Sequence, residues 1–136
     1  MNKLLLLLSI PLLSIPQQTY VPDNNFEAYL ENNGMGNGTP YDDYVTTKNI
    51  NTITYLDVSM GAESNTGIFD LTGIEYFTNL TELDCSYNQL TELNVSQNIQ
   101  LTFVWCTDNE IDCIQVWDIQ SPEQNFWYKD MMLYGH

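Results

Sequence analysis

A repeat between Leu80 and Gln120 constrains the fold of this chain more than any other feature. The segment LTELDCSYNQLTELNVSQNIQ is followed directly by LTFVWCTDNEIDCIQVWDIQ, and the two match at a spacing of 21 residues. The matched pairs are Leu80/Leu101, Thr81/Thr102, Leu83/Val104, Cys85/Cys106, Asn88/Asn109, Leu90/Ile111, Leu93/Ile114 and Val95/Val116. A short fixed period in apolar and Asn positions is typical of stacked repeats, because one unit cannot bury its own apolar side.

Each repeat line begins with a short strand. Leu83 and Cys85 alternate with Glu82 and Asp84, so the apolar side chains face inward and the acidic ones outward. The segment 53–59 matches 80–86 but precedes it by 27 residues, which places about six extra residues in an insert at 60–67. These copies predict a parallel sheet on one side of a flattened coil.

The other side of the coil is predicted to be irregular. Residues 90–98 repeat the strand pattern and predict an extended or short-strand segment. Three-residue spacing of Ile68, Leu71, Ile74, Phe77 and Leu80 predicts tight 3₁₀ turns. The resulting fold class is α/β, a short repeat solenoid with parallel strands. Asn88 and Asn109 are predicted to form a structural ladder that satisfies backbone groups at the turns, with a surface turn as the alternative.

The N-terminal third carries two further signals. Residues 1–18 have Lys3 followed by an apolar run broken by Pro11, which indicates a secretory signal peptide; a retained anchor or a buried helix is the alternative. Residues 22–34 predict a helix, with Asn24 and Glu27 resembling a capping box and Gly34 at its end. Asp42 and Asp43 in the following loop form either a cation site or a solvated turn, and the calcium-loop pattern is absent.

The charge balance excludes some partners. The chain has 18 acidic and 3 basic residues, a net charge of −15. Nucleic acid and anionic membranes favour clustered Lys and Arg, so neither is an expected partner. We expect no cofactor, no metal site and no stable membrane span after signal removal, and a monomer.

The chain resembles secreted leucine-rich repeat proteins of Gram-negative bacteria. The resemblance rests on TYVPDNNFEAYLENNGMGNG, NINTITYLDVS and DLTGIEYFTNLTELDCSYNQLTELNVSQN, and covers roughly residues 19–116. It implies a signal peptide (1–18), an N-terminal helical cap and loop (19–49), leucine-rich repeats (50–119) and a C-terminal cap (120–136). It also implies protein binding at the cell surface or outside the cell. The cap departs from the family pattern, because no Cys follows Cys113; the cap is incomplete or the reading frame is truncated.

Three cysteines leave one without an obvious partner. Cys85 and Cys106 share an inward repeat position. Stacked strands would bring their Cα atoms within disulfide range, but with parallel side chains, so we expect two buried thiols. Cys113 remains unassigned.

The outward strand positions form the candidate binding surface. Aromatic rings beside carboxylates are common in protein-binding and sugar-binding surfaces. The alternative is that Phe126 and Trp127 of the C-terminal cap fold over the aromatic residues. The candidate concave face consists of three rows, namely Tyr55, Glu82 and Phe103; Asp57, Asp84 and Trp105; and Ser59, Ser86 and Thr107.

The sequence therefore predicts an acidic, exported binding module for an unknown protein, of adhesion type. A calcium-stabilised adhesin or a glycan-binding module is the alternative. Paired carboxylates would be needed for glycoside hydrolysis, but repeated acids usually form a solvated face. The body of the chain lacks a His, a G-x-S-x-G elbow and a phosphate loop. We therefore expect no enzymatic activity.

Overall fold

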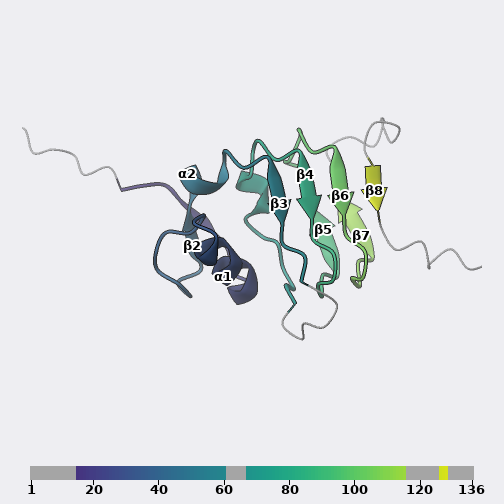
Figure 1. Cartoon of the computed structure of the whole chain (residues 1–136), viewed down its shortest axis with the longest axis horizontal. Helices are drawn as coiled ribbons and strands as arrows, with labels where there is room; N and C mark the ends of the chain where they lie inside the picture. Colours follow the sequence, from purple (N-terminus) through teal and green to yellow (C-terminus); the bar gives the residue numbers. More distant parts are fainter. Residues whose placement is uncertain (1–14, 61–66, 116–125, 129–136) are drawn as a thin grey trace, which may run out of the picture.

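The computed structural model describes residues 15–60, 67–115 and 126–128 (Figure 1). In these segments the chain forms short strands, two helices and one 3₁₀ turn. In chain order they are β1 (Gln18–Tyr20), α1 (Asn24–Asn32), β2 (Tyr44–Thr46), α2 (Thr47–Ile50), β3 (Tyr55–Asp57), η1 (Ile74–Tyr76), β4 (Glu82–Asp84), β5 (Glu92–Asn94), β6 (Phe103–Trp105), β7 (Cys113–Gln115) and β8 (Phe126–Tyr128).

One side of the molecule is a parallel sheet with the strand order β3-β4-β6-β8. Leu56 lies beside Leu83, and Leu83 beside Val104. Each of these residues is the central, buried position of its strand. The alternation of apolar and polar residues thus sets the register, because a slip of one residue would turn every Leu outward. The parallel sheet that the repeat predicts is present.

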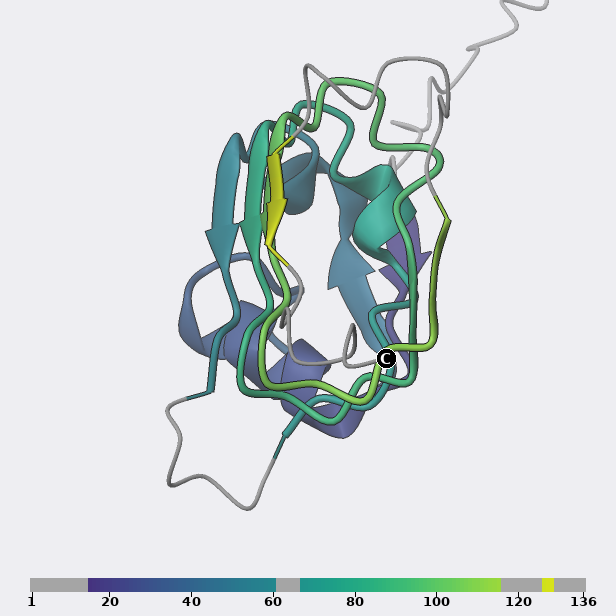
Figure 2. The ribbon, with the colours of Figure 1, turned by 90° about the vertical axis from the view of Figure 1, so that its right-hand side faces the viewer.

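The opposite side is built from shorter and less regular pieces. β5 pairs with β7 in a second parallel sheet, with Leu93 beside Ile114. In the turn before β5, the chain instead forms η1 at Ile74–Tyr76, within the segment predicted to contain 3₁₀ turns. Figure 2 shows the successive turns of the chain following nearly the same path, with the two sheets on opposite sides.

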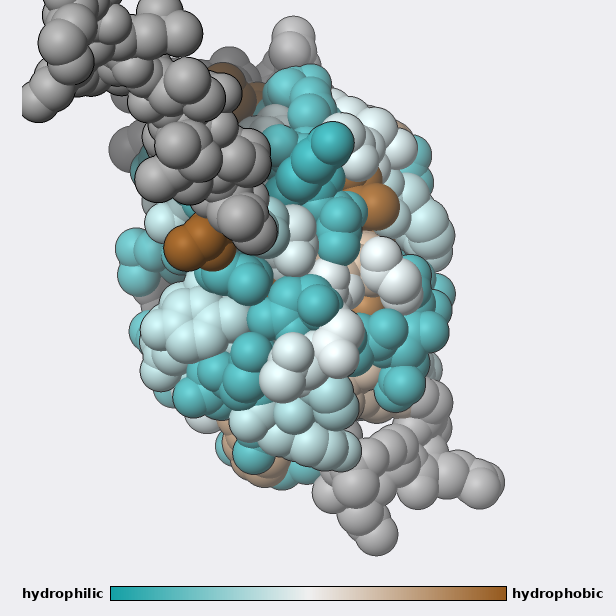
Figure 3. Space-filling model, turned by 90° about the vertical axis from the view of Figure 1, so that its left-hand side faces the viewer, coloured by the Kyte–Doolittle hydropathy of each residue, from teal (hydrophilic) through white to brown (hydrophobic). Residues whose placement is uncertain are grey.

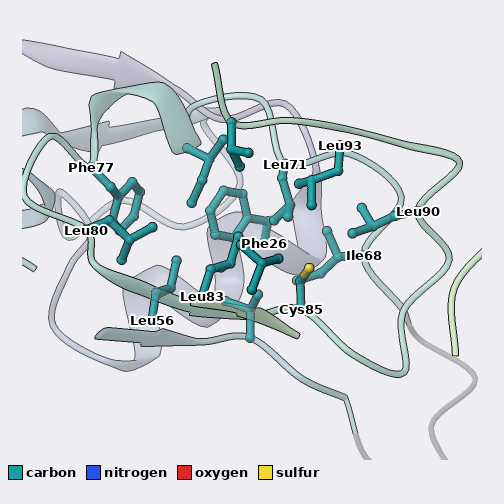
Figure 4. Packing of buried hydrophobic residues seen from close by; sticks show 14 of the residues in the cluster. Phe26, Leu56, Ile68, Leu71, Phe77, Leu80, Leu83, Cys85, Leu90 and Leu93 are labelled. Atoms are coloured by element: carbon teal, nitrogen blue, oxygen red, sulfur yellow. The ribbon is translucent and has the colours of Figure 1, made fainter. Parts of the chain in front are cut away.

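The core lies between these two sides. Leu83 and Leu93 come from opposite sheets and are both almost fully buried. The ring centroids of Phe26, from α1, and Phe77 lie 6.3 Å apart in a stacked arrangement, so the helix joins the same core (Figure 4). Full burial of such a side chain contributes about 1.5–3 kcal/mol. The core therefore links the helix and both sheets.

An antiparallel pair that the sequence analysis missed precedes the parallel sheet. β1 pairs with β2, with Thr19 beside Val45, and the hydroxyl oxygens of Thr19 and Thr47 lie 2.8 Å apart in a buried hydrogen bond. The pairing extends outward, since the Thr47 N–H donates to the carbonyl of Gln17 at 2.9 Å. Three-residue strands that are separated in the chain by α1 and a loop carry too little periodicity to be recognised from sequence.

The predicted helix is present as α1, but its cap differs from the prediction. Asp23, not Asn24, is the N-cap, and its Oδ1 accepts the N–H groups of Asn25 and Phe26 at 2.9 and 3.0 Å. Oδ2 of the same carboxylate accepts the N–H groups of Phe69 and Asp70 at 2.7 and 3.1 Å. One acidic side chain therefore caps the helix and ties it to the first turn of the array.

Glu27 does not reach back to the start of the helix as a capping box requires. Its side chain is fully buried and accepts the N–H groups of Asp42 and Asp43 at 3.1 and 3.3 Å. The two backbone donors satisfy a buried carboxylate that would otherwise be costly. Asp42 also accepts the N–H of Tyr44, at 3.0 Å. This loop is therefore organised around Glu27.

The N-terminal elements cover one end of the array. Figure 3 shows that this end presents a mainly hydrophilic surface. The predicted signal peptide falls largely on residues 1–14, and much of the predicted C-terminal cap on 116–125 and 129–136; these segments lie outside the described residues. Within the described part of the chain, no helix has the length and apolar character that a membrane span requires.

Candidate binding face

The outward positions of the large sheet come together as rows. Tyr55 lies beside Glu82 and Glu82 beside Phe103, while Asp57 lies beside Asp84 and Asp84 beside Trp105. These six residues are the exposed or half-buried positions of their strands. We call them the outer face of the large sheet. They carry three carboxylates and three aromatic rings, on a sheet whose other side is the core.

The acidic half of this face converges on Tyr55, which is 53% exposed. The pKa of Tyr55 lies above its ordinary value, through partial desolvation first and then through the charges of Asp57, Asp84 and Glu82. These carboxylates disfavour a further negative charge, so a cationic or hydrogen-bond-donating group is the chemistry that this half can accept.

The aromatic half is formed by Phe103 and Trp105. Their ring centroids lie 5.8 Å apart and their planes are inclined by 11°, a stacked pair on one strand. Both side chains are half-buried. β8 continues the sheet beside β6, and the register aligns Phe126 with Phe103 and Tyr128 with Trp105. The backbone of this C-terminal segment thus forms the next strand of the sheet.

The third predicted row is less accessible than the first two. Ser86 is only 5% exposed, so it does not contribute to the outer face as predicted. Ser59 and Thr107 are half-buried. β3 and β4 are each followed by a turn in which an Asp side chain accepts the N–H two residues on: Asp57 from Ser59, and Asp84 from Ser86, both at 3.0 Å. These turns draw the serines toward the backbone.

Asn88 and Asn109 occupy equivalent corners of successive turns. Oδ1 of Asn88 accepts the Ile68 N–H at 2.8 Å, and Oδ1 of Asn109 accepts the Leu90 N–H at 3.0 Å. Both amides donate to the carbonyl of Cys85, at 3.0 and 2.9 Å. The two side chains thus satisfy backbone groups of their own turn and of the preceding one, a structural role that leaves them little capacity for a ligand.

A third Asn of this kind, Asn98, was missed by the sequence analysis. It is fully buried and donates to the carbonyls of Ile74 and Phe77 at 2.8 and 3.2 Å. Within the described part of the chain, its Oδ1 is buried without a hydrogen-bond partner. The available signal was that Asn98 closes the second half of the repeat, as Asn88 closes the first.

Cys85 and Cys106 are both buried. The Cys85 thiol lies 3.4 Å from the carbonyl oxygen of Trp105. Burial raises the pKa of Cys85 well above its ordinary value, and Cys106 and Asp84 raise it further. The two cysteines therefore fill buried positions directly after the adjacent strands β4 and β6. Among residues 15–60, 67–115 and 126–128, no group of three or more His, Cys, Asp or Glu side chains is placed to hold a metal ion.

Strands that recur in parallel register, inward Leu and Cys positions and buried Asn corners define a leucine-rich repeat architecture. Comparison with known proteins supports a bacterial protein of this class. No protein-family model matches the chain. The Gram-negative part of the predicted resemblance is not confirmed, because the similar protein described next comes from Listeria, which is Gram-positive.

The chain is similar to Internalin J of Listeria monocytogenes serotype 4b (strain F2365). The two are 37% identical over 79 residues, which cover 58% of this chain and 8% of that protein. It is also similar to the solved functional domain of Internalin J, described as including a cysteine ladder. That match has a TM-score of 0.54 and 25% identity, and covers 83% of this chain and 28% of that domain. This chain thus spans only a small part of the protein that it resembles.

Proposed function

We propose that this chain is a short leucine-rich repeat solenoid that binds a protein partner of adhesion type through the outer face of its large sheet. The observation that carries the proposal is the alignment of one exposed and two half-buried aromatic rings with three carboxylates, in register across β3, β4 and β6. Its similarity to an internalin supports a protein-interaction module rather than an enzyme. The same similarity supports a surface or exported location.

We further propose that residues 1–18 contain the export signal, that 19–49 cap the repeats of 50–119, and that 120–136 close the far end. Because Gln17 and Gln18 take part in the β1–β2 pairing, a mature chain that keeps β1 is cleaved before Gln17. N-terminal sequencing of the exported protein tests this. A mature N-terminus after Gln17 would contradict it, since part of the β1–β2 pairing would be lost.

The binding proposal is tested on a panel of defined extracellular proteins and glycans. We expect the native chain to bind at least one protein, and Tyr55→Ala and Trp105→Ala to weaken that binding at least about tenfold, as for an interface hot spot. The control is Phe69→Ala, which removes a ring of similar exposure (58%, against 53% for Tyr55) outside the face. The melting temperature of each variant is also measured. A large fall in the melting temperature of Trp105→Ala would show that this residue belongs to the core.

Two outcomes would overturn the proposal. Binding that Tyr55→Ala and Trp105→Ala leave intact while Phe69→Ala abolishes it would place the site elsewhere. Binding to glycans alone would replace the protein partner with a sugar. Melting with and without a chelator addresses the calcium-stabilised alternative, which predicts a clear fall in melting temperature when calcium is removed.

A further inference from the structure

A hollow lies on the side of the molecule opposite the large sheet. It measures about 390 Å³ and lies between the 70–75 segment of the first turn and β5 of the next. Its apolar lining consists of Leu71, Ile74 and Leu93, all of which belong to the core. Its remaining lining residues are polar, with three carboxylates among them. Nothing in the repeat pattern predicts a site here.

The hollow exists because the two turns follow different paths at this point. Two residues, Thr72 and Gly73, separate the inward residues Leu71 and Ile74, whereas only Asn94 separates Leu93 from Val95. Gly73 has φ of +105° and leads into η1. The 70–75 segment therefore bulges outward beside the extended strand β5, and the space between the two segments is open.

The charged groups of the hollow differ in how they are engaged. Asp70 accepts the Thr72 N–H at 2.8 Å, and Glu75 accepts the Gly73 N–H, also at 2.8 Å. The Glu92 side chain, at the start of β5, is exposed, and its carboxylate makes no hydrogen bond within the described part of the chain. No lining residue carries a positive charge. The hollow therefore combines two fixed carboxylates and one available carboxylate with an apolar lining.

We propose that this hollow binds an arginine side chain presented by a basic segment of a protein partner. The guanidinium carries a full positive charge and several N–H donors, which carboxylates accept in strong hydrogen bonds. Its methylene stem can lie along Leu71 and Leu93, as long basic side chains commonly do on apolar surfaces. The net charge of −15 would attract such a segment at long range. The site is separate from the outer face of the large sheet.

The test is an NMR titration of the full chain with acetyl-Gly-Arg-Gly-amide. The matched probe is the same peptide with citrulline, which keeps the shape of arginine and lacks its charge. We expect the arginine peptide to bind with a Kd on the order of 1 mM and to shift the amide signals of Asn94, Ser96 and Gln97. The citrulline peptide should bind at least about fivefold more weakly. Added salt should weaken the binding of the arginine peptide but not that of the citrulline peptide.

Two variants with the same change in charge locate the binding. Glu92→Gln should weaken the binding of the arginine peptide about threefold to fivefold, the range expected for the loss of an exposed ion pair. Glu110→Gln, at an exposed position outside the hollow, should leave it unchanged. Both side chains are exposed, so melting temperatures should stay near the native value.

Several results would overturn the proposal. The first is that the amide signals of the hollow do not shift when the arginine peptide is added. The second is that the citrulline peptide binds as well as the arginine peptide. The third is that Glu92→Gln and Glu110→Gln weaken binding to the same extent. Stronger binding of a neutral disaccharide at the same amides would assign the hollow to sugars. None of these results bears on the large sheet, whose partner is tested by Tyr55→Ala.

Discussion

The two sides of the array carry the same repeat in different ways. On the large sheet, β3, β4 and β6 stack with their apolar positions aligned. On the opposite side, the 70–75 segment that leads into η1 and the strand β5 of the next turn line one hollow. The sheet is regular because backbone pairing and side-chain alternation impose the same register there. The other side needs only to return the chain and supply apolar residues, so its path can vary from turn to turn.

The buried corners show the same contrast. Asn88 both accepts and donates, bridging its own turn and the preceding one. Asn98, on the irregular side, donates to two carbonyls, but its Oδ1 has no hydrogen-bond partner among the residues that the structure describes. A complete hydrogen-bond set at one corner and an incomplete set at the other indicate that the regular side is the more strongly specified.

The largest effect is expected where the two sides share their interior. Leu83→Asp and Leu93→Asp each place a charge between stacked turns, at positions with 0% and 1% exposure. A buried unpaired charge costs several kcal/mol, a large part of the total stability of a domain. Both variants should therefore be unfolded by circular dichroism, while exposed Gln97→Asp stays folded. A soluble Leu83→Asp protein with native melting would show that the turns do not share one core.

The next largest effect on stability is expected at the two buried asparagines, Asn88 and Asn98. Asn88→Ala removes the acceptor for Ile68 N–H and donors to several carbonyls, and we expect a loss of about 2–4 kcal/mol. Asn98→Ala also leaves two carbonyls without their hydrogen-bond donor, but it removes an oxygen that accepts no hydrogen bond within the described part of the chain. The loss in the free energy of unfolding should therefore be smaller, about 1–2 kcal/mol. Urea unfolding of both variants measures the difference. Equal losses would mean that the two corners are equally specified.

Two glycines with positive φ differ in how closely other atoms pack against them. At Gly73, φ is +105°, and an added Cβ would lie 2.8 Å from Val21 Cγ2 and 2.9 Å from the Tyr20 carbonyl oxygen. At Gly34, φ is +73° and the space is open. Gly73→Ala should therefore cost about 2–4 kcal/mol and Gly34→Ala about 1 kcal/mol. Thermal unfolding of the pair checks the order, and a reversed order would mean that β1 is not held against η1.

The sequence could predict the regular side because its signals are periodic. Leu83, Val104 and the Asn at the following corner recur at one spacing, which fixed the strands, their direction and their rows. The irregular side lacked such a signal, because its inward residues are spaced differently in successive turns. Leu71 and Ile74 are three positions apart, whereas Leu93 and Val95 are two apart, so the hollow beside Glu92 could not be predicted. Glu27 was misassigned for a similar reason. A carboxylate near a helix start fits a capping box, whereas burial by loop residues 15 positions away leaves no local pattern.

The smallest effect concerns the thiol at the centre of the regular side. Desolvation raises the pKa of Cys85 well above 9.0, and Cys106 and Asp84 add to this. Since the folded state holds this proton more tightly than the unfolded state, stability should be unaffected by this group below pH 9 and should fall as pH rises above it. Alkylation of Cys85 near pH 8 should therefore be limited by unfolding, and mass spectrometry after brief iodoacetamide treatment, with and without urea, measures this. Rapid modification of the folded chain would show that the large sheet opens on its own, and the contrast between the two sides would be reversed.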